Sequence, residues 1–478
     1  MKTIRILLGF LWFIPINNGL NAQETYNVLF ICADGLRPTL GCYGDSYAVT
    51  PHIDGLAKKG IVFERAYCQQ ASCAPSRASL MTGLRPDTLQ IISGNVHFRD
   101  VLPDAITLPQ AFKRHGYHTQ AFGLVYHAHP PQPDSVSWSI PEQLLDIPKR
   151  DEYLLPTNRI RGFINRMEKG TATEAVEAPD NAYQDGQVAQ LAIETLTHIK
   201  EKPFFLAVGF KRPHLPFSVP KKYWDIYDSE TIPLPVDTVY PVCTPQEVAL
   251  RYSWQYNKGE MRAYTDIPDE GSLDRDKIKE VIHGYYASVS YIDNQIGRLL
   301  QALDSLDLSR KTIVVLWSDH GCHLGERGLW GKNDLTENSA RVPLVVSVPD
   351  MRGAGQKSRA LVELVDVYPT LIALCGISVP FDLHGVSLVP VLENPHRELK
   401  SAAFSSYPRM GNTVMGYSVR TSGYRYTEYL EIATGKVIDR ELYNMDKDPL
   451  QYENLVREKG MKAVVSHHQT LLNRQWEK

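Results

Sequence analysis

The sequence predicts an α/β protein with a mixed, mostly parallel sheet flanked by helices, followed by a smaller C-terminal α+β region. Three short apolar runs are typical of strands buried on both faces: Asn27–Ala33, Pro203–Phe210 and Thr312–Trp317. Helical patterns lie between these runs, and strands that alternate with helices form parallel sheets. The length of 478 residues and the hydrophobic content of 43% suit a large core and exclude a disordered chain.

Helices are predicted where apolar residues recur at helical spacing. Residues 188–199 place apolar side chains on one face, and residues 278–303 repeat them at alternating spacings of four and three. Thr50-Pro51 is typical of a helix start, with threonine as the cap and proline in the first turn. Pro103–Gly116 is a further helix candidate, and His118–Tyr126 is a further strand candidate.

The remaining segments divide the chain into domains. Residues 128–180 and 215–270 are rich in proline together with polar or aromatic residues, and we expect little regular structure there. Toward the C-terminus, short alternating runs favour a small antiparallel sheet, and residues 459–475 favour a final helix. The predicted domains are therefore residues 23–384 and residues 385–478.

The first 22 residues have the pattern of a secretory signal peptide. Lys2 and Arg5 precede the apolar run Ile6–Ile16, which is too short to span a bilayer, and Ala22 is a small residue at the cleavage point. We therefore expect a periplasmic or secreted protein that keeps no membrane contact once the signal is removed.

Seven cysteines are an odd set, so at least one has a role outside a disulfide. A formal net charge of −3 argues against a nucleic-acid partner.

Polar residues directly follow the three buried strands. Asp34 follows the first, Lys211, Arg212 and His214 follow the second, and Asp319-His320 follows the third. In sheets of this kind, ligands bind beyond the carboxyl ends of the strands. Carboxylate oxygens and an imidazole are common ligands of divalent cations, so this edge of the sheet is a candidate metal site.

One motif carries a specific chemistry. Cys73-Ala74-Pro75-Ser76-Arg77, followed by Ala78-Ser79-Leu80-Met81-Thr82-Gly83, resembles the signature C-x-P-S-R-x-S-x-x-T-G of the type I, formylglycine-dependent sulfatases. In that family the cysteine is oxidised to formylglycine. Pro75 can start a helix and Gly83 can end it, which would place Cys73 at a helix N-terminus, where anions are favoured. We expect Arg77, one turn further on, to direct its guanidinium at a sulfate.

The resemblance extends over nearly the whole mature chain. Residues 36–44, residues 204–217 and Arg341-Val342-Pro343-Leu344 look like the iduronate-2-sulfatase branch of the family. It implies an alkaline-phosphatase-like fold and hydrolysis of a sulfate ester, with the branch suggesting the 2-position of a uronic acid in glycosaminoglycan oligosaccharides. It also implies a formylglycine-generating or anaerobic maturation enzyme as a partner.

Site residues follow from the same resemblance, position by position. The catalytic candidates are Cys73, Arg77, His127, His214 and Lys332. The candidate ligands of one calcium ion (Ca2+) are Asp34, Cys73, Asp319 and His320. The candidate substrate-binding cations are Lys211, Arg212 and Arg99.

Two positions depart from the family pattern. Asp34-Gly35 stands where the family commonly has two adjacent aspartates, and Gly123-Leu124 stands where it commonly has glycine and a sulfate-binding lysine. Lys211 is a candidate replacement for the lysine. Two alternatives stay open beside the 2-O-sulfatase reading, and the departures favour only the first of them. One is a sulfatase-derived protein of reduced or no activity that binds sulfated glycans, and the other is a hydrolase of another sulfate or phosphate ester.

Overall fold

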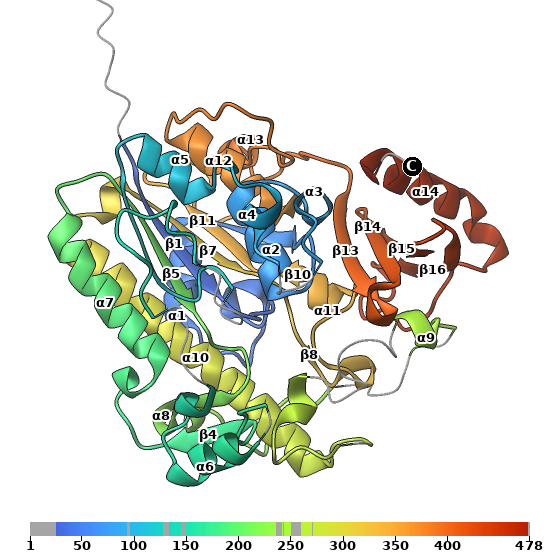
Figure 1. The fold of residues 1–478 in the computed structure, drawn as a ribbon, viewed down its shortest axis with the longest axis horizontal. Helices are drawn as coiled ribbons and strands as arrows, with labels where there is room; N and C mark the ends of the chain where they lie inside the picture. Colours follow the sequence, from blue (N-terminus) through green and yellow to red (C-terminus); the bar gives the residue numbers. More distant parts are fainter. Residues whose placement is uncertain are drawn as a thin grey trace, which may run out of the picture.

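A computed structural model describes residues 25–92, 96–127, 133–144, 149–165, 167–235, 241, 243–249, 260–269 and 271–476. The proposed signal peptide at residues 1–22 lies outside this part of the chain. Most of the described chain packs around one large mixed sheet, and a second, antiparallel sheet forms a separate unit near the C-terminus (Figure 1). Both features confirm the predicted fold class.

The large sheet has eight strands. Their order is β10-β2-β11-β7-β1-β5-β3, with β12 paired to β2. The centre is parallel, because β1 pairs with β5 and β7 in the same direction, whereas β10 and β11 run antiparallel to β2. The strands are β1 (Asn27–Ala33), β2 (Ile61–Tyr67), β3 (His118–Gly123), β5 (Phe204–Phe210), β7 (Thr312–Ser318), β10 (Arg341–Val342), β11 (Leu344–Ser347) and β12 (Lys357–Glu363).

Helices cover both faces of this sheet (Figure 1). Alternate residues of β1 point to opposite faces: Leu29 and Ile31 pack in one apolar cluster, and Val28 and Phe30 in the other. The first cluster includes α1 (Pro51–Lys59), α7 (Gln184–Ile199) and α10 (Arg275–Ser305). The second includes α2 (Cys73–Thr82), α5 (Leu108–Arg114), α12 (Val367–Leu374) and α13 (Val389–Glu393). Burial on both faces explains why the central strands are apolar without alternation.

Several local predictions need correction. The helix expected over Pro103–Gly116 begins only at Leu108, because Thr107 and Gln110 form a capping box there. Thr50 does not cap α1 with its side chain; its hydroxyl accepts a hydrogen bond from the amide of Gly41 instead.

Short elements also occur in the segments expected to be irregular. They are α6 (Pro156–Ile164), β4 (Thr173–Val176), β6 (Phe217–Pro220), α8 (Lys221–Trp224) and α9 (Gln246–Ala249), together with the 3-10 turns η2 (Lys149–Glu152) and η4 (Glu260–Ala263). Further short elements lie outside these two segments: α3 (Pro86–Leu89), α4 (Phe98–Val101), β8 (His323–Leu324), β9 (Trp330–Gly331) and α11 (Glu337–Ala340).

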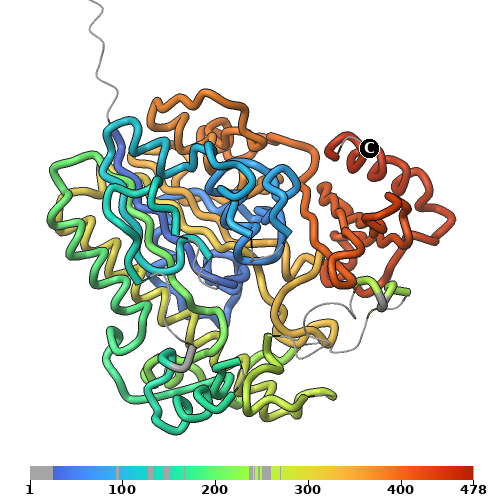
Figure 2. Tube along the Cα trace, in the orientation of Figure 1, coloured from blue at the N-terminus to red at the C-terminus, as the bar shows by residue number. Residues whose placement is uncertain are grey.

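The C-terminal unit is a four-stranded meander with one helix on it. The order β13-β14-β15-β16 follows the chain, and Figure 2 shows this unit as a body beside the main one. Its elements are β13 (Ala403–Arg409), β14 (Val414–Arg420), β15 (Tyr424–Glu431), β16 (Val437–Asn444) and α14 (Lys462–Trp476). Leu388, Val391 and Leu392 still pack in the apolar cluster of the large sheet, so the chain leaves that sheet after α13.

Buried polar contacts join the two sheets. Glu337 of α11 accepts hydrogen bonds from Arg425 of β15 (2.7 Å), Arg420 of β14 (3.3 Å) and Tyr67 of β2 (2.9 Å). The Ser405 hydroxyl of β13 donates to the carbonyl oxygen of Cys68 at 2.6 Å. The small sheet is therefore fixed against the end of β2, next to the start of α2.

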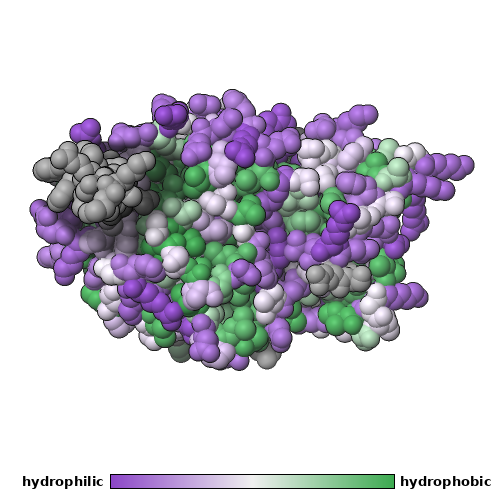
Figure 3. Space-filling model, turned by 90° about the horizontal axis from the view of Figure 1, so that it is seen from above, coloured by the Kyte–Doolittle hydropathy of each residue, from purple (hydrophilic) through white to green (hydrophobic). Residues whose placement is uncertain are grey.

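The surface mixes polar and apolar residues. On the face seen in Figure 3, hydrophobic residues gather in the central part and hydrophilic residues border them along the rim. Within the described residues, no helix has both the length and the apolar content needed to cross a membrane.

Candidate active site

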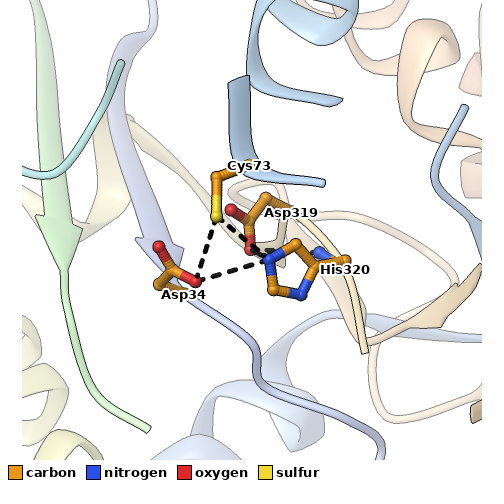
Figure 4. A group of neighbouring side chains, drawn as sticks. All are labelled: Asp34, Cys73, Asp319 and His320. Atoms are coloured by element: carbon orange, nitrogen blue, oxygen red, sulfur yellow. Dashed lines mark hydrogen bonds and ion pairs between the residues drawn. The ribbon is translucent and has the colours of Figure 1, made fainter. Parts of the chain in front are cut away.

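Four side chains from three separate segments meet at the carboxyl end of the large sheet (Figure 4). Asp34 follows β1, Cys73 is the first residue of α2, and Asp319 and His320 follow β7. One ligand atom from each lies within 4.8 Å of the others. Of the residues that follow the three buried strands, Asp34, Asp319 and His320 therefore lie together at this edge of the sheet.

The start of α2 places Cys73 in this group. The helix begins at Cys73, two residues earlier than predicted, and ends at Gly83, whose φ of +69° is a left-handed conformation that suits glycine. The Cys73 sulfur lies 3.2 Å from His320 Nε2 and 3.7 Å from Asp34 Oδ1. Burial, together with the charge of Asp34, raises the pKa of the Cys73 thiol well above its usual value. The unmodified thiol therefore stays protonated and is a poor nucleophile.

Arg77 stabilises the two carboxylates of the site through its buried guanidinium. Its side chain is fully buried, with Nε donating to Asp319 Oδ2 at 2.8 Å and Nη2 lying 3.2 Å from Asp34 Oδ2. Nη1 donates to the carbonyl oxygen of Val125 at 3.2 Å and to that of Leu124. The guanidinium is thus directed at protein oxygens, which differs from the expected direct aim at a sulfate. Its charge offsets two buried carboxylates that would otherwise repel each other.

His320 is oriented as a ligand. Its Nδ1 lies 2.9 Å from the carbonyl oxygen of Gly321, which can only accept a hydrogen bond, so the ring proton sits on Nδ1. Nε2 then presents a lone pair to the group, 3.5 Å from Asp34 Oδ1 and 3.6 Å from Asp319 Oδ1. Burial lowers the pKa of His320, which keeps the ring neutral. A lone pair and two carboxylate oxygens that face one another fit a divalent cation.

Charges around Asp34 keep it ionised. Burial alone would raise the pKa of its carboxyl group, but His214, Arg77 and Lys332 together hold the pKa well below its usual range. The site therefore presents negative oxygen ligands at neutral pH.

Both departures from the family pattern lie beside this group. The Gly35 amide donates to Asp319 Oδ1 at 3.1 Å, and the φ of +68° at Gly35 is left-handed. A Cβ atom at this position would lie 3.5 Å from Cε1 of His320, an ordinary contact distance. Leu124 is buried, and its carbonyl oxygen accepts a hydrogen bond from Arg77.

A second set of charges lies on the other side of Cys73. Lys332, which follows β9, places Nζ 3.4 Å from the Cys73 sulfur and 3.3 Å from Glu260 Oε2. The other oxygen of Glu260 lies 2.5 Å from His214 Nε2. Burial alone would lower the pKa of Lys332, but Cys73, Glu260 and Asp34 raise it well above its usual value. Lys332 is therefore an ammonium group facing the reacting position.

Sequence reasoning missed Glu260. It lies in the short turn η4, within a segment expected to be irregular, and no motif contains it. The signal that could have found it is physical, because the buried ammonium of Lys332 needs a counter-charge. The C-terminal unit borders this side of the site, since Arg409 of β13 donates to the carbonyl oxygen of Asn333 at 2.6 Å, next to Lys332.

The three predicted substrate-binding cations are all paired with groups of the protein. Arg99 donates all five of its N–H groups within the protein, to Asp134, Gln110 and the carbonyl oxygens of Pro103 and Ala105. It has no donor left for a substrate, so this assignment is corrected.

Lys211 and Arg212 are held by buried acids. Lys211 Nζ lies 2.8 Å from Glu152 Oε1, and Arg212 Nη1 lies 3.3 Å from Glu152 Oε2. Asp185 accepts hydrogen bonds from both backbone amides. The ammonium group of Lys211 is therefore paired with Glu152. Its role as a replacement for the lysine that the family commonly has at position 124 stays a prediction. His127 is half-buried at the end of a described segment after β3, and its predicted role stays a prediction.

Comparison with known proteins agrees with this geometry. The sulfatase family model matches residues 26–377, and the model of the C-terminal part of N-sulphoglucosamine sulphohydrolase matches residues 325–478. Iduronate 2-sulfatase of Mus musculus is 33% identical and spans 91% of this chain and 92% of its own.

Solved structures share the fold at lower identity. A protein bound to its substrate D-glucosamine-2-N,6-O-disulfate has a TM-score of 0.75 at 22% identity, and covers 95% of this chain and 98% of its own. A 2-O glycosaminoglycan sulfatase has a TM-score of 0.73 at 22% identity, and covers 95% of this chain and 92% of its own. The fold is therefore the alkaline-phosphatase-like fold of the sulfatases. With the signature segment, the converging carboxylates and the family match together, the chain belongs to the sulfatase family and is a sulfuric ester hydrolase.

Proposed function

We propose that this sulfatase removes the 2-O-sulfate of a uronic acid in glycosaminoglycan oligosaccharides, with a formylglycine derived from Cys73 as the nucleophile. The observation that carries the proposal is the position of Cys73. Its side chain lies at the N-terminus of α2, between the carboxylate of Asp34 and the ammonium of Lys332. The identity with iduronate 2-sulfatase over most of both chains supports the choice of substrate class.

The chemistry needs an aldehyde at position 73. Its hydrate has two hydroxyl groups, one to attack sulfur and one to expel sulfate afterwards and restore the aldehyde, whereas serine has only the first. The protonated Cys73 thiol of the unmodified chain is a poor nucleophile and has no second hydroxyl to expel sulfate, which supports the conversion. Lys332, 3.4 Å from the Cys73 sulfur, is placed to hold the sulfate by its charge.

Asp34, Asp319 and His320 would hold one divalent ion, which we propose to be calcium. Carboxylate oxygens are the ligands that calcium prefers, and the formylglycine hydrate would add an oxygen where cysteine has sulfur. Such an ion polarises the sulfate oxygens when bound. Arg77 keeps both carboxylates oriented toward it.

Two histidines complete the assignment. His214 protonates the leaving oxygen, and His127 assists the chemistry of the hydrate. We further propose that the chain is exported to the periplasm or beyond, that its residues 1–22 are removed, and that a formylglycine-generating or anaerobic maturation enzyme modifies Cys73. The partner is then a sulfated oligosaccharide.

The test combines mass spectrometry with a substrate panel. We expect the Cys73 peptide from the native host to be lighter by about 18 Da than the unmodified peptide, as oxidation of a thiol to an aldehyde requires. We expect sulfate release from a 2-O-sulfated uronate disaccharide, with little from a 6-O-sulfated glucosamine or a phosphate monoester. Turnover confined to one of the latter compounds would overturn the substrate assignment.

A second candidate function is binding of sulfated glycans without hydrolysis. The buried Leu124, at a position where the family commonly has a lysine, favours it. A convertible Cys73 with the ligands of a metal around it disfavours it, because a binding protein needs neither. Tight binding of the disaccharide by a protein whose Cys73 stays unmodified in its own host would establish this alternative.

A further inference from the structure

The hydrogen bonds of His214 determine its protonation state. Nδ1 lies 2.8 Å from the carbonyl oxygen of Leu215, an acceptor without a proton to offer. Nε2 lies 2.5 Å from Glu260 Oε1. With Glu260 ionised, both ring nitrogens face acceptors, so both carry a proton and the ring is an imidazolium.

Glu260 is held in the ionised state by more than one cation. Its second carboxylate oxygen lies 3.3 Å from Lys332 Nζ. Burial alone would raise the pKa of Glu260, but His214, Lys332 and Lys169 hold that pKa well below its usual range. The carboxylate therefore does not take the proton away from His214.

We propose that Glu260 is a positioning residue that keeps His214 doubly protonated and ready to protonate the leaving oxygen of the sulfate ester. This inference rests on the proposed function, in which His214 is the general acid. The inference also predicts that the effect of Glu260 depends on the leaving group, since an alkoxide leaving group of a sugar needs that proton whereas an acidic phenol does not.

The proton transfer balances without another reactant. As the bond between sulfur and the leaving oxygen breaks, both electrons stay on the oxygen, which takes the Nε2 proton in place of Glu260 Oε1, the atom that accepts it in the structure. His214 is left neutral, with its remaining proton on Nδ1 directed at Leu215. Glu260 stays a carboxylate, because Lys332 remains beside its other oxygen.

Other charged groups also lie near His214. Asp34 and Glu152 both have their pKa lowered by His214, so both favour its charged form, and Lys332 opposes it. In the part of the chain that the structure describes, Glu260 makes the shortest ion pair with this ring. Glu260 is therefore the charged group whose removal tests the environment of His214 most directly.

The first test uses Glu260→Gln, which keeps the size of the side chain and removes its charge. In the metal-loaded, formylglycine-containing enzyme, we expect kcat/KM for the 2-O-sulfated uronate to fall by about tenfold to a hundredfold. For 4-nitrophenyl sulfate, whose leaving group is acidic, we expect a change within about threefold. Glu177→Gln, at a strongly exposed carboxylate, is the matched control and should change neither rate.

The second test follows the pH profile. The reaction needs protonated His214, and loss of the Glu260 charge disfavours that protonated form, so Glu260→Gln should move the decline of the rate with rising pH to lower pH. In a His214→Gln background, Glu260→Gln should add no further loss for the uronate substrate. A shift in the profile and this non-additivity distinguish the inference from a purely structural effect.

The outcomes separate the inference from the proposed function. A wild-type enzyme that releases no sulfate refutes the proposed function itself. An active wild type whose pH profile and leaving-group preference are unchanged by Glu260→Gln refutes only the role of Glu260. A gain in activity in Glu260→Gln also refutes it, because the carboxylate would then occupy the sulfate position. If Glu260→Gln unfolds at the assay temperature, Glu260→Asp, which keeps the charge, should retain the wild-type leaving-group preference.

Discussion

Lys332 Nζ lies 3.4 Å from the sulfur of Cys73, although 259 residues separate the two in sequence. The contact joins two segments that are far apart in the sequence, since α2 supplies the cysteine and the loop after β9 supplies the lysine. Arg409 of the small sheet fixes the carbonyl oxygen of Asn333 beside that lysine. The charge that faces the reacting position is therefore set where the small antiparallel sheet meets the loop after β9.

Lys332→Gln should lower kcat/KM for sulfate release by about a hundredfold, because one preorganised cation near a developing negative charge contributes on the order of 3 kcal/mol. The comparison is with Lys222→Gln, at a largely exposed lysine, which should leave the rate unchanged. An equal loss in both variants would contradict the assignment. Circular dichroism and thermal unfolding check that Lys332→Gln still folds.

Cys73→Ala and Cys73→Ser should both abolish turnover, with losses of at least about a thousandfold in kcat. Alanine offers no nucleophile, and serine attacks once without a second hydroxyl to expel the sulfate. Sulfate release is measured by ion chromatography. Cys243→Ser, at an exposed cysteine, is the control that should stay active. Full activity of Cys73→Ala would disprove the covalent mechanism.

Removal of the metal should inactivate the enzyme, and Asp319→Asn should do the same. Two carboxylates and one neutral imidazole face one position, and the loss of either charge weakens attraction for a divalent cation. We expect dialysis against a chelator to abolish sulfate release and calcium to restore it in the wild type only. Equilibrium dialysis with calcium measures the affinity directly, independently of activity. Unchanged calcium affinity in Asp319→Asn would rule out this ligand set.

Leu124→Lys tests the departure at the position where the family commonly has a sulfate-binding lysine. If a missing cation limits the rate, the lysine should raise kcat/KM by up to about a hundredfold. Gly35→Asp should tighten calcium binding, at the cost of about 1 kcal/mol of stability, because its φ of +68° is unfavourable for a residue with a side chain. Robust wild-type turnover with no gain from either change would mean that the site is complete as it stands.

Glu337 makes stability depend on pH. Burial alone would raise its pKa, but Arg425, Arg420 and Arg341 lower it from 4.5 to about 2. An acid whose pKa is lower in the folded state stabilises the protein above its unfolded pKa, so this contribution is lost as pH falls from about 5 toward 2. Glu337→Gln should destabilise the protein by about 3–5 kcal/mol at pH 7, since two buried arginines lose their partner.

Urea unfolding at pH 7, 5 and 3.5 measures that effect. The difference between wild type and Glu337→Gln should shrink as the pH is lowered, because protonation removes the same charge from the wild type. Glu230→Gln, at an exposed carboxylate, gives the reference behaviour. A difference that stays constant across this range would show that the ion pair does not titrate.

The sequence was sufficient for the elements that place the site. The apolar runs at β1, β5 and β7 need burial on both faces, and that requirement is visible in the residues themselves. Because parallel strands end at one edge, the convergence of Asp34, Asp319 and His320 followed from the strand order. The start of α2 was less well defined, since Cys73 and Ala74 precede the proline that was expected to open the helix.

What the sequence could not supply were contacts that depend on tertiary packing. Arg77 matches a sulfate-binding pattern, yet its buried guanidinium is directed at Asp34 and Asp319. Arg99 carries the positive charge expected of a substrate-binding residue, but its guanidinium forms an ion pair with Asp134. Glu260 belongs to a segment without periodicity, and its partners His214 and Lys332 lie far away along the chain. Pairing of this kind leaves no local trace in sequence.

The pairing of β2 sets the order in which the molecule can be completed during synthesis. This strand ends only a few residues before Cys73, and its partners β10, β11 and β12 are among the last strands of the large sheet to leave the ribosome. Until they arrive, the sheet against which α2 packs is incomplete, although nearly all of α2 is buried in the finished protein. A modifying enzyme that acted on Cys73 would therefore find it most accessible before these strands pair.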